Sequence, residues 1–251
     1  MIPLELQFHT SDSIKMPESS ERPTVNTILR ASTLLNALTE DEIQSLARVC
    51  RMAHAERGEL IWWNGSEVDY FGIAGTGFVK MVQSDSNGAD TTIELMGPGQ
   101  IFGMMGTITG RGCPLRAEAM TSLWYVRIPK QQFLPIYEKS GNLKDRLIRK
   151  TSIRFQDMVN LFTRMASGKV DQRVAAILMI LAESYGERVG RRIRLGVPLT
   201  RQEIGEMAGT TTETTIRVLS RWQKDGLIAT DSHHIVILNE DELARILGKL
   251  I

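Results

Sequence analysis

Threonine, glutamate and arginine side chains crowd residues 209–219, which read GTTTETTIRVL. Threonine is a mediocre helix former because its β-branched side chain is stiff, so five threonines at the start of a helix-like segment indicate another role. Their hydroxyls can cap free backbone N–H groups and reach phosphates. Glu213 and Arg217 share one helix face, where a carboxylate can accept from cytosine N4 and a guanidinium can bind guanine O6 and N7. The structural alternative is an ion pair between these two side chains, together with a helix cap.

Flanking residues predict two short helices around a tight turn. Thr200 and Glu203 have the spacing of a capping box, and the apolar face that follows stops at Gly209. Thr210 and Glu213 offer a second capping box, and the segments RRIRLGVPLT and IATDSHHIVIL resemble strands on either side. The inward face of the second helix is expected to consist of Thr215, Val218, Leu219 and Trp222. These features predict a winged helix-turn-helix, whose second helix enters the major groove of DNA by its start.

Composition limits the possible classes of protein. With 251 residues, 42% hydrophobic and 24% charged, the chain fits two modest domains and is unlike a disordered protein. Its formal net charge is +1, so contact with nucleic acid must come from local basic runs such as KDRLIRK and GERVGRRIR. The chain lacks a run of about 18 apolar residues and a signal-peptide pattern, so we expect no membrane partner and a cytoplasmic location. Cys50 and Cys113 are too few for a disulfide framework.

From His54 to Pro129, short strand-like pieces alternate with glycine-containing turns. This pattern predicts a β sandwich or jelly-roll barrel, with SDSNGADTTIEL as its clearest hairpin. Ahead of it, Thr39 and Glu42 form a capping box that opens an amphipathic helix. The expected fold is α+β: a flexible tail at 1–25, an effector-sensing barrel at 26–138, a dimerisation helix at 139–166 and a winged helix-turn-helix domain at 167–251.

A long helical stretch from Leu143 to Met165 carries apolar residues at heptad spacing. A seam of this length needs a partner helix, so we expect a parallel two-helix homodimer; packing of the seam on the barrel is the alternative. The expected dimer interface consists of Ile148, Thr151, Phe155, Met158, Phe162 and Met165.

The barrel stretches GELIWWNG, GFVKMVQSDSNG and GPGQIFGMMG, with the segment LTRQEIGEMAGTTTETTIRVLSRWQKDGLI, resemble the Crp/Fnr family of bacterial transcription regulators over residues 28–247. The resemblance implies a homodimer on two-fold-related double-stranded DNA, an effector in or near the barrel, no catalytic residues, and RNA polymerase as a partner if the protein is an activator. By position, Glu213 and Arg217 match the family's base-reading pair, and residues 200–202 match its phosphate-contacting helix start. The expected DNA-binding residues are Thr200, Arg201, Gln202, Thr211, Thr212, Glu213, Thr214, Ile216, Arg217 and Arg221.

Two of these positions depart from the cyclic-AMP-responsive members that the chain resembles. Thr212 stands where those members place a base-reading arginine, and Ile216 stands where many members have serine or glycine. We therefore expect the half-site to keep the central TG-containing core read by Glu213 and Arg217 but to differ at its edges, with Ile216 against a thymine methyl group.

The barrel departs further. Cyclic-nucleotide binders of the family use a Gly-Glu dipeptide for the ribose and an Arg-Ser pair for the phosphate, whereas here Met104 follows Gly103 and Cys113 precedes a proline at the second place. A thioether cannot hold a ribose diol or offset phosphate charge, so cyclic nucleotides are disfavoured. Arg111 or Arg116 could substitute, which keeps a cyclic-nucleotide-responsive regulator as an alternative. The expected effector pocket consists of Gly103, Met104, Met105, Arg111, Cys113 and Arg116.

Cofactors are not expected. An iron-sulfur cluster needs four cysteines and the chain has two, while haem would depend on the lone His54 or a methionine. An unknown apolar or weakly polar effector, redox chemistry at Cys113, or no effector remain open. A metal-dependent cupin enzyme needs clustered ligands, but residues 53–130 contain only His54, so no metal site is expected. A signalling module that does not bind DNA is the rival from another class, and it would have no use for residues 200–228.

Overall fold

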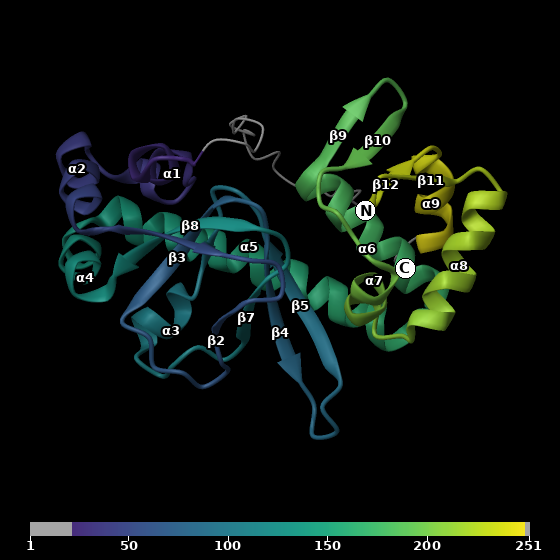
Figure 1. Ribbon diagram of the computed structural model, residues 1–251, viewed down its shortest axis with the longest axis horizontal. Coiled ribbons are helices and arrows are strands. Elements are labelled where there is room, and N and C mark those ends of the chain that lie inside the picture. Colours follow the sequence, from purple (N-terminus) through teal and green to yellow (C-terminus); the bar gives the residue numbers. More distant parts are fainter. Residues whose placement is uncertain (1–21, 249–251) are drawn as a thin grey trace, which may run out of the picture.

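The structure is a computed structural model that describes residues 22–248 of the chain (Figure 1). The predicted α+β fold is confirmed: a β barrel and a helix-turn-helix domain lie side by side along one long helix. Most of the tail predicted at 1–25 lies outside the described residues. Its last part is ordered, because Arg22 lies 4.9 Å from the centre of the Trp124 ring and helix α1 begins at Val25. None of the helices in the described part of the chain is long and apolar enough to cross a membrane.

The barrel consists of two four-stranded antiparallel sheets, within residues 22–248. One sheet has the strand order β1-β8-β3-β6 and the other β2-β7-β4-β5. The strands are β1 (Arg51–Ala55), β2 (Leu60–Trp62), β3 (Tyr70–Thr76), β4 (Val79–Ser84), β5 (Asp90–Met96), β6 (Ile101–Phe102), β7 (Arg116–Ala119) and β8 (Leu123–Pro129). The hairpin predicted from SDSNGADTTIEL is the β4–β5 pair, in which Ser84 lies opposite Asp90.

Short helices cover one side of the barrel (Figure 1). They are α1 (Val25–Ala31), η1 (Leu35–Ala37), α2 (Glu40–Val49), α3 (Met104–Thr109) and α4 (Lys130–Lys139). The capping box predicted at the start of α2 is confirmed, since the Thr39 hydroxyl accepts from the Glu42 N–H and the Glu42 carboxylate accepts from the Thr39 N–H at 2.8 Å. These helices bury an apolar cluster against β3 and β8 that is separate from the barrel interior.

Aromatic side chains fill the barrel interior. The Trp62 ring stacks on Phe102 with their centres 5.3 Å apart, and Phe102 lies 5.7 Å from Tyr125. Interior packing is so tight that a Cβ atom on Gly72 would come within 2.2 Å of the Phe102 ring. Such density leaves the strands little freedom to shift relative to one another.

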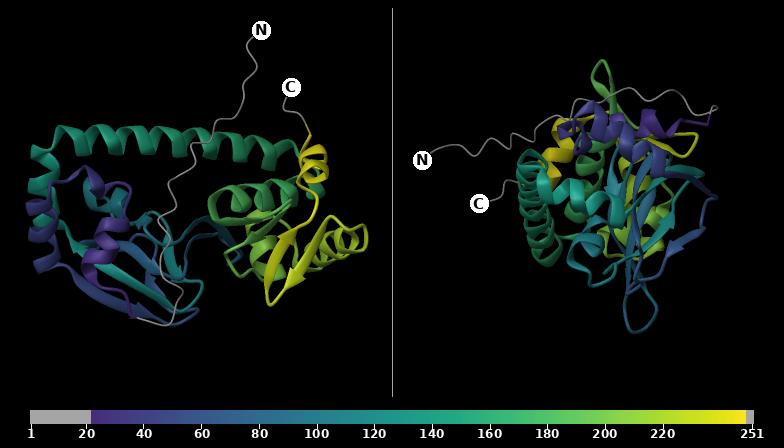
Figure 2. Two further views of the ribbon diagram at one scale, coloured as in Figure 1. Left: turned by 90° about the horizontal axis from the view of Figure 1, so that it is seen from above. Right: turned by 90° about the vertical axis from the view of Figure 1, so that its left-hand side faces the viewer.

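Helix α5 (Gly141–Ser167) confirms the predicted long helix and runs along one edge of the molecule (Figure 2, left). Most of its heptad seam is uncovered. Phe155 is 66% exposed and Phe162 is 72% exposed, and Ile148, Thr151 and Met158 are exposed as well. Met165 differs, because it packs against the core of the C-terminal domain. The alternative in which the whole seam packs on the barrel is therefore wrong.

The C-terminal domain contains the predicted winged helix-turn-helix. A four-stranded sheet of order β11-β12-β10-β9 lies beside its helices. Its elements are α6 (Val170–Tyr185), β9 (Gly186–Val189), β10 (Arg192–Leu195), α7 (Arg201–Ala208), α8 (Thr212–Lys224), β11 (Ile228–Asp231), β12 (His234–Ile237) and α9 (Glu240–Leu247).

The barrel and the C-terminal domain share one hydrophobic core. Phe78 and Leu95 of the barrel are buried in the same apolar cluster as the inward residues of α6, α7 and α8. Tyr185 at the end of α6 packs edge-on against Phe78 at 5.2 Å. Its hydroxyl lies 2.9 Å from the Leu95 carbonyl oxygen and 2.7 Å from Gln100 Oε1, so its single proton is shared between these two acceptors. The two domains are joined by packing as well as by α5.

A β-bulge in β5 lets both Thr92 and Leu95, which are three residues apart, contact the C-terminal domain. Glu94 pairs with Met81 and Thr92 pairs with Val82, so Ile93 is an extra residue in the ladder. In a regular strand, Thr92 and Leu95 would point to opposite faces. Because of the bulge, the Thr92 hydroxyl donates to Glu206 of α7 at 3.3 Å while Leu95 joins the shared core.

Candidate DNA-binding interface

The start of α7 is held by a complete capping box. The Glu203 carboxylate accepts from the Thr200 N–H at 2.7 Å, and the Thr200 hydroxyl accepts from the Glu203 N–H at 3.1 Å. Arg57 of the barrel donates to the other oxygen of Glu203 at 3.1 Å. The predicted box is confirmed, and the barrel reinforces it. Gln202, one of the expected phosphate contacts, is left exposed beside it.

The cap of α8 differs from the prediction by one residue. Thr211, and not Thr210, is the N-cap, because its hydroxyl accepts from the Thr214 N–H at 3.2 Å. The second capping box predicted for Thr210 and Glu213 is therefore wrong. The physical reason lies in the turn: Gly209 adopts φ +58° and the Thr210 N–H donates to the Gly205 carbonyl at 2.9 Å, which places Thr210 within the turn.

One face of α8 is uncovered along its first turns. Glu213 and Arg217 are exposed, and Ile216 between them is 48% exposed. Among residues 22–248, no ion pair joins Glu213 to Arg217, which removes the structural alternative for the pair. The opposite face is buried as expected, at Thr215, Val218, Leu219 and Trp222. Both side chains can thus approach base edges without first breaking a contact.

Other expected DNA contacts already have partners in the protein. Arg221 donates to Asp171 of α6 at 2.5 Å. Arg201 donates to the Thr230 hydroxyl at 3.1 Å, and this hydroxyl also accepts from Gln223 at 2.8 Å. A guanidinium has five donors, so Arg201 retains free N–H groups for a phosphate. Thr214 is partly buried, and its hydroxyl accepts from Thr211 at 3.1 Å.

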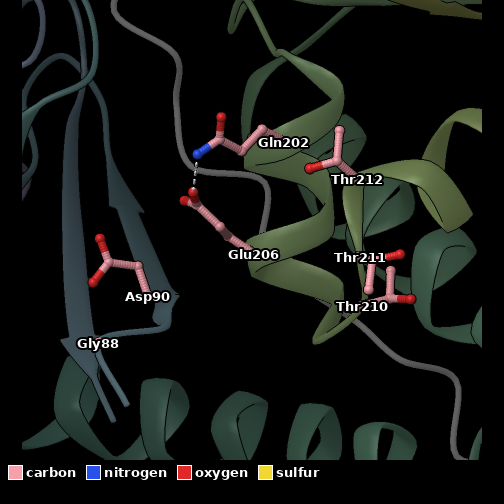
Figure 3. Close-up of a pocket in the computed structure, with 7 residues that line it drawn as sticks. All are labelled: Gly88, Asp90, Gln202, Glu206, Thr210, Thr211 and Thr212. Atoms are coloured by element: carbon pink, nitrogen blue, oxygen red, sulfur yellow. Dashed lines mark hydrogen bonds between the residues drawn. The ribbon is translucent and has the colours of Figure 1, made fainter. Parts of the chain in front are cut away.

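A polar groove lies between the barrel and the start of α8. Figure 3 places Gly88 and Asp90 of the β4–β5 hairpin opposite Gln202 and Glu206 of α7, with residues 210–212 at its far wall. The groove has a volume of about 320 Å³. Burial would raise the pKa of Asp90, but hydrogen bonds from Arg116 and Ser84 hold the pKa below its ordinary range. Two carboxylates, Asp90 and Glu206, therefore line the groove, and the Glu206 carboxylate accepts from Gln202 Nε2 at 3.0 Å.

The residues expected to form an effector pocket are not brought together. Met104 is buried in the apolar cluster under the short helices, whereas Cys113 is buried in the aromatic barrel interior. Met105 is 62% exposed, and Arg111 is also exposed. The expectation that Met104, Met105 and Cys113 belong to one effector pocket is wrong, because the loop after β6 turns into α3 and directs neighbouring side chains to different surroundings.

The barrel residues do not fit a cyclic nucleotide. Arg116 donates to Asp90 at 2.5 Å and lies 3.3 Å from Glu118, so its charge is already compensated. Gly103 has φ +80°, and a Cβ atom there would come within 2.7 Å of the Trp62 ring, which occupies the space beneath it. A ribose and a phosphate would need both a free cation and this space.

Cys113 is poorly suited to redox sensing. Its side chain is 1% exposed, and burial raises the pKa of its thiol. Oxidants attack the thiolate, so a buried thiol with a raised pKa reacts slowly. Cys50 is also buried, and burial raises the pKa of its thiol to about 12. Within the described part of the chain, no group of three or more His, Cys, Asp or Glu side chains is placed to hold a metal ion.

Comparison with known families agrees with this two-domain architecture. Residues 52–140 match the family described as "Cyclic nucleotide-binding domain", and residues 172–246 match the "Crp-like helix-turn-helix domain". The chain belongs to the Crp/Fnr family of transcription regulators. It is accordingly a DNA-binding transcription regulator and not an enzyme.

Relatives in the Crp/Fnr family align along most of this chain. The "Transcriptional activator protein anr" of Pseudomonas aeruginosa is 24% identical over 213 residues, which cover 84% of this chain and 87% of that protein. The "Fumarate and nitrate reduction regulatory protein" of Escherichia coli strain K12 is also 24% identical, over 212 residues and 84% of each protein.

Solved structures of similar fold include FixK2 from Bradyrhizobium japonicum, with a TM-score of 0.71 and 20% identity over 80% of this chain and 99% of that chain. A mutant of CooA from Carboxydothermus hydrogenoformans has a TM-score of 0.69 and 15% identity over 91% of this chain and 97% of that chain. At these identities, the likeness concerns the fold alone.

Several residues that support the DNA-binding helices could not be predicted from local sequence patterns. Arg57, Asp171 and Arg173 contact the helix-turn-helix from distant segments, the last by donating to the Gly209 carbonyl at 3.1 Å. Their contacts are 36 to 146 residues apart in sequence, beyond the reach of helical or strand spacing.

Substituting the N-cap of α8 tests its corrected position. Thr211→Ala removes the acceptor for the Thr214 N–H, so it should lower the free energy of unfolding by about 0.5–2 kcal/mol and weaken DNA binding. Thr210→Ala is the matched control, and a change within about 0.5 kcal/mol is expected. Urea unfolding measures both. If Thr210→Ala lowers the free energy of unfolding more than Thr211→Ala does, Thr210 is the N-cap of α8.

Proposed function

We propose that this regulator binds a two-fold-related DNA site as a homodimer, with Glu213 and Arg217 of each subunit reading bases in the major groove. The observation that carries the proposal is the exposed face of α8, where both side chains are free of protein partners within residues 22–248. Arg217 would bind guanine O6 and N7, and Glu213 would accept from cytosine N4. Ile216 is exposed between them and would contact a thymine methyl group.

Phosphate contacts would come from the helix starts. Gln202 and Thr211 are exposed beside the free backbone N–H groups of α7 and α8, where the helix dipole favours an anion. Arg201, fixed by its hydrogen bond to Thr230, would present its remaining donors to the backbone. These contacts position α8 on the duplex without discriminating between sequences.

The apolar seam of α5 supports the homodimer. Phe155 and Phe162 are large, apolar and more than half exposed, and Met158 lies between them on the same face. A contiguous apolar strip of this kind is typical of an interface and costly to leave in water. A second copy of α5 supplies the matching heptads, so a parallel pair would bury the strip symmetrically.

Regulation is proposed to be independent of cyclic AMP, since Arg116 is compensated by Asp90 and Glu118 and the space beside Gly103 is filled by Trp62. Either an effector of another class acts on the barrel or DNA binding is constitutive. A role as an activator would add RNA polymerase as a partner.

Substitution of Arg217 tests base reading. Arg217→Ala should lower affinity for the specific operator by about tenfold to a hundredfold, because a bidentate contact contributes about 1–3 kcal/mol of discrimination. Arg217→Lys keeps the charge but loses the two-pronged geometry, so it should fail similarly. Arg201→Ala should instead weaken all sequences alike and flatten the salt dependence. Band-shift titrations on the upstream DNA measure these effects, and normal specific binding by Arg217→Ala would refute the assignment.

Charged residues in the seam test dimerisation. Phe155→Glu combined with Met158→Glu places four carboxylates along a paired α5, which the interface cannot hydrate, so a monomer is expected. Loss of the second half-site should weaken operator binding by about 10²–10⁴-fold. Val189→Glu, at an equally exposed apolar residue on β9, is the control and should remain dimeric. Sedimentation velocity decides, and a dimer in the double variant would move the interface elsewhere.

Ligand titration tests the proposed independence from cyclic nucleotides. Millimolar cyclic AMP or cyclic GMP should change neither the melting temperature nor the operator affinity, whereas a ligand at 100 times its Kd would add about 2.7 kcal/mol of stability. A thermal shift with cyclic AMP that disappears in Arg116→Gln or Arg111→Gln would overturn this proposal and identify the phosphate ligand.

A further inference from the structure

Three consecutive side chains in the first turn of α6 contact three different parts of the molecule. Gln172 accepts from the Lys169 N–H at 2.9 Å and so closes the junction between α5 and α6. Asp171 binds Arg221 on α8, and Arg173 binds the turn between α7 and α8. This turn of α6 connects the end of the proposed dimerisation helix directly to the recognition helix, and we name Asp171, Arg173 and Arg221 the α6 clamp.

Arg173 is the more constrained member of the α6 clamp. Its Nη1 donates to the Gly209 carbonyl at 3.1 Å, at the residue whose φ of +58° turns the chain into α8. Its stem lies against Gly168, where an added Cβ atom would be 3.4 Å from Arg173 Cγ. The Nε of Arg173 is buried with no hydrogen-bond partner in the described residues. A buried unpaired donor is costly, so this arginine is poorly explained by stability and better explained by the geometry that it imposes.

Asp171 and Arg221 form the second strut of the α6 clamp. Asp171 Oδ2 and Arg221 Nη2 are 2.5 Å apart, and the side chains are 41% and 49% exposed. An ion pair this exposed contributes little to stability. It does, however, fix the C-terminal half of α8 at one orientation about the axis of α6, while Arg173 fixes the turn that precedes its N-terminal half.

We propose that the α6 clamp sets the direction in which each subunit presents α8, so that Asp171 and Arg173 are positioning residues that determine which half-site spacing the dimer accepts. Arg221 then acts through Asp171 and does not contact DNA. The inference rests on the proposed homodimer and on the proposed reading of DNA by α8.

Small rotations of α8 within each subunit change the distance between the two recognition helices. In a two-fold dimer, both recognition helices must enter major grooves about 34–36 Å apart, and one base pair changes that distance by about 3.4 Å. The α5 pair supplies the fixed axis, and α8 is attached to α6 beyond the α5–α6 junction, so any rotation of α8 against α6 displaces the two recognition helices in opposite directions. Both contacts of the α6 clamp join the first turn of α6, just past this junction, to α8 or to the turn before it, and so keep the separation of the two recognition helices constant.

Operators of varied spacing test the role of Arg173. Arg173→Met keeps the length of the side chain but removes the donor to Gly209. The wild-type protein should bind one spacing best, and Arg173→Met should bind that operator about tenfold more weakly and lose most of its preference over spacers one base pair longer or shorter. Affinity for an isolated half-site should stay within about twofold of wild type, because α8 itself is intact.

Two results would overturn the positioning role. An unchanged preference for operator spacing would show that Arg173 does not orient the two recognition helices. A half-site affinity that falls as far as the operator affinity would place Arg173 in the stability of the helix-turn-helix itself. Arg217→Ala and the sedimentation of each variant are measured in parallel. If Arg217→Ala binds normally or the wild type is monomeric, the proposed function has failed and not the clamp alone.

A double-mutant cycle tests whether Arg221 acts through Asp171. Asp171→Asn and Arg221→Gln should each weaken the best operator by about twofold to fivefold, and the combined variant should be no weaker than either. The salt dependence should be unchanged, whereas loss of a phosphate contact would lower its slope by about 1. Arg245→Gln, which breaks an ion pair with Glu242 on α9, is the control and should bind as wild type. Additive losses with a lower salt slope would return Arg221 to the DNA interface.

Discussion

The hydrophobic core shared by the barrel and the C-terminal domain is the constraint on which the rest of the structure depends. Tyr185 packs against this core, held by Phe78 on one side and by a hydrogen bond from its hydroxyl on the other. Burial raises the pKa of this phenol, so it remains a hydrogen-bond donor at any physiological pH. Because interiors are close-packed, the helices that follow cannot drift relative to strands β4 and β5. The shared core therefore holds the C-terminal domain as a whole against the barrel.

Helix α6 connects the shared core to the recognition helix. Its last residue, Tyr185, enters the core shared with the barrel, and its first turn contacts the α5–α6 junction and the recognition helix. An effector in the barrel could alter DNA affinity only by favouring one of two states of such a connection. The strand β5 is the nearest candidate element, since Met96 packs into the barrel interior and the adjacent Leu95 packs into the shared core.

Sequence patterns predicted the features that depend on neighbours along the chain. The capping boxes at Thr39 and Thr200, the long helix and the inward face of α8 follow from spacings of three, four and seven residues. The cap of α8 was missed by one residue because the capping-box spacing singles out Thr210 and Glu213, whereas the conformation of Gly209 places Thr210 within the turn. The surroundings of Met104 and Cys113, and the partner of Arg221, depend on segments far away in sequence, which no periodicity encodes.

The extra residue in β5 determines which face of the strand each later side chain occupies, because side chains alternate between the two faces. Inserting one more residue between Thr92 and Leu95 would add one step to the ladder and send one of them to the wrong face, so either the contact with α7 or the shared core would be lost. At the hairpin tip, residues 85–89 form a turn outside both ladders, and adding residues there leaves the pairing from Ser84 onward unchanged. The hairpin can thus accept inserted residues at its tip but not a few residues away, next to the bulge.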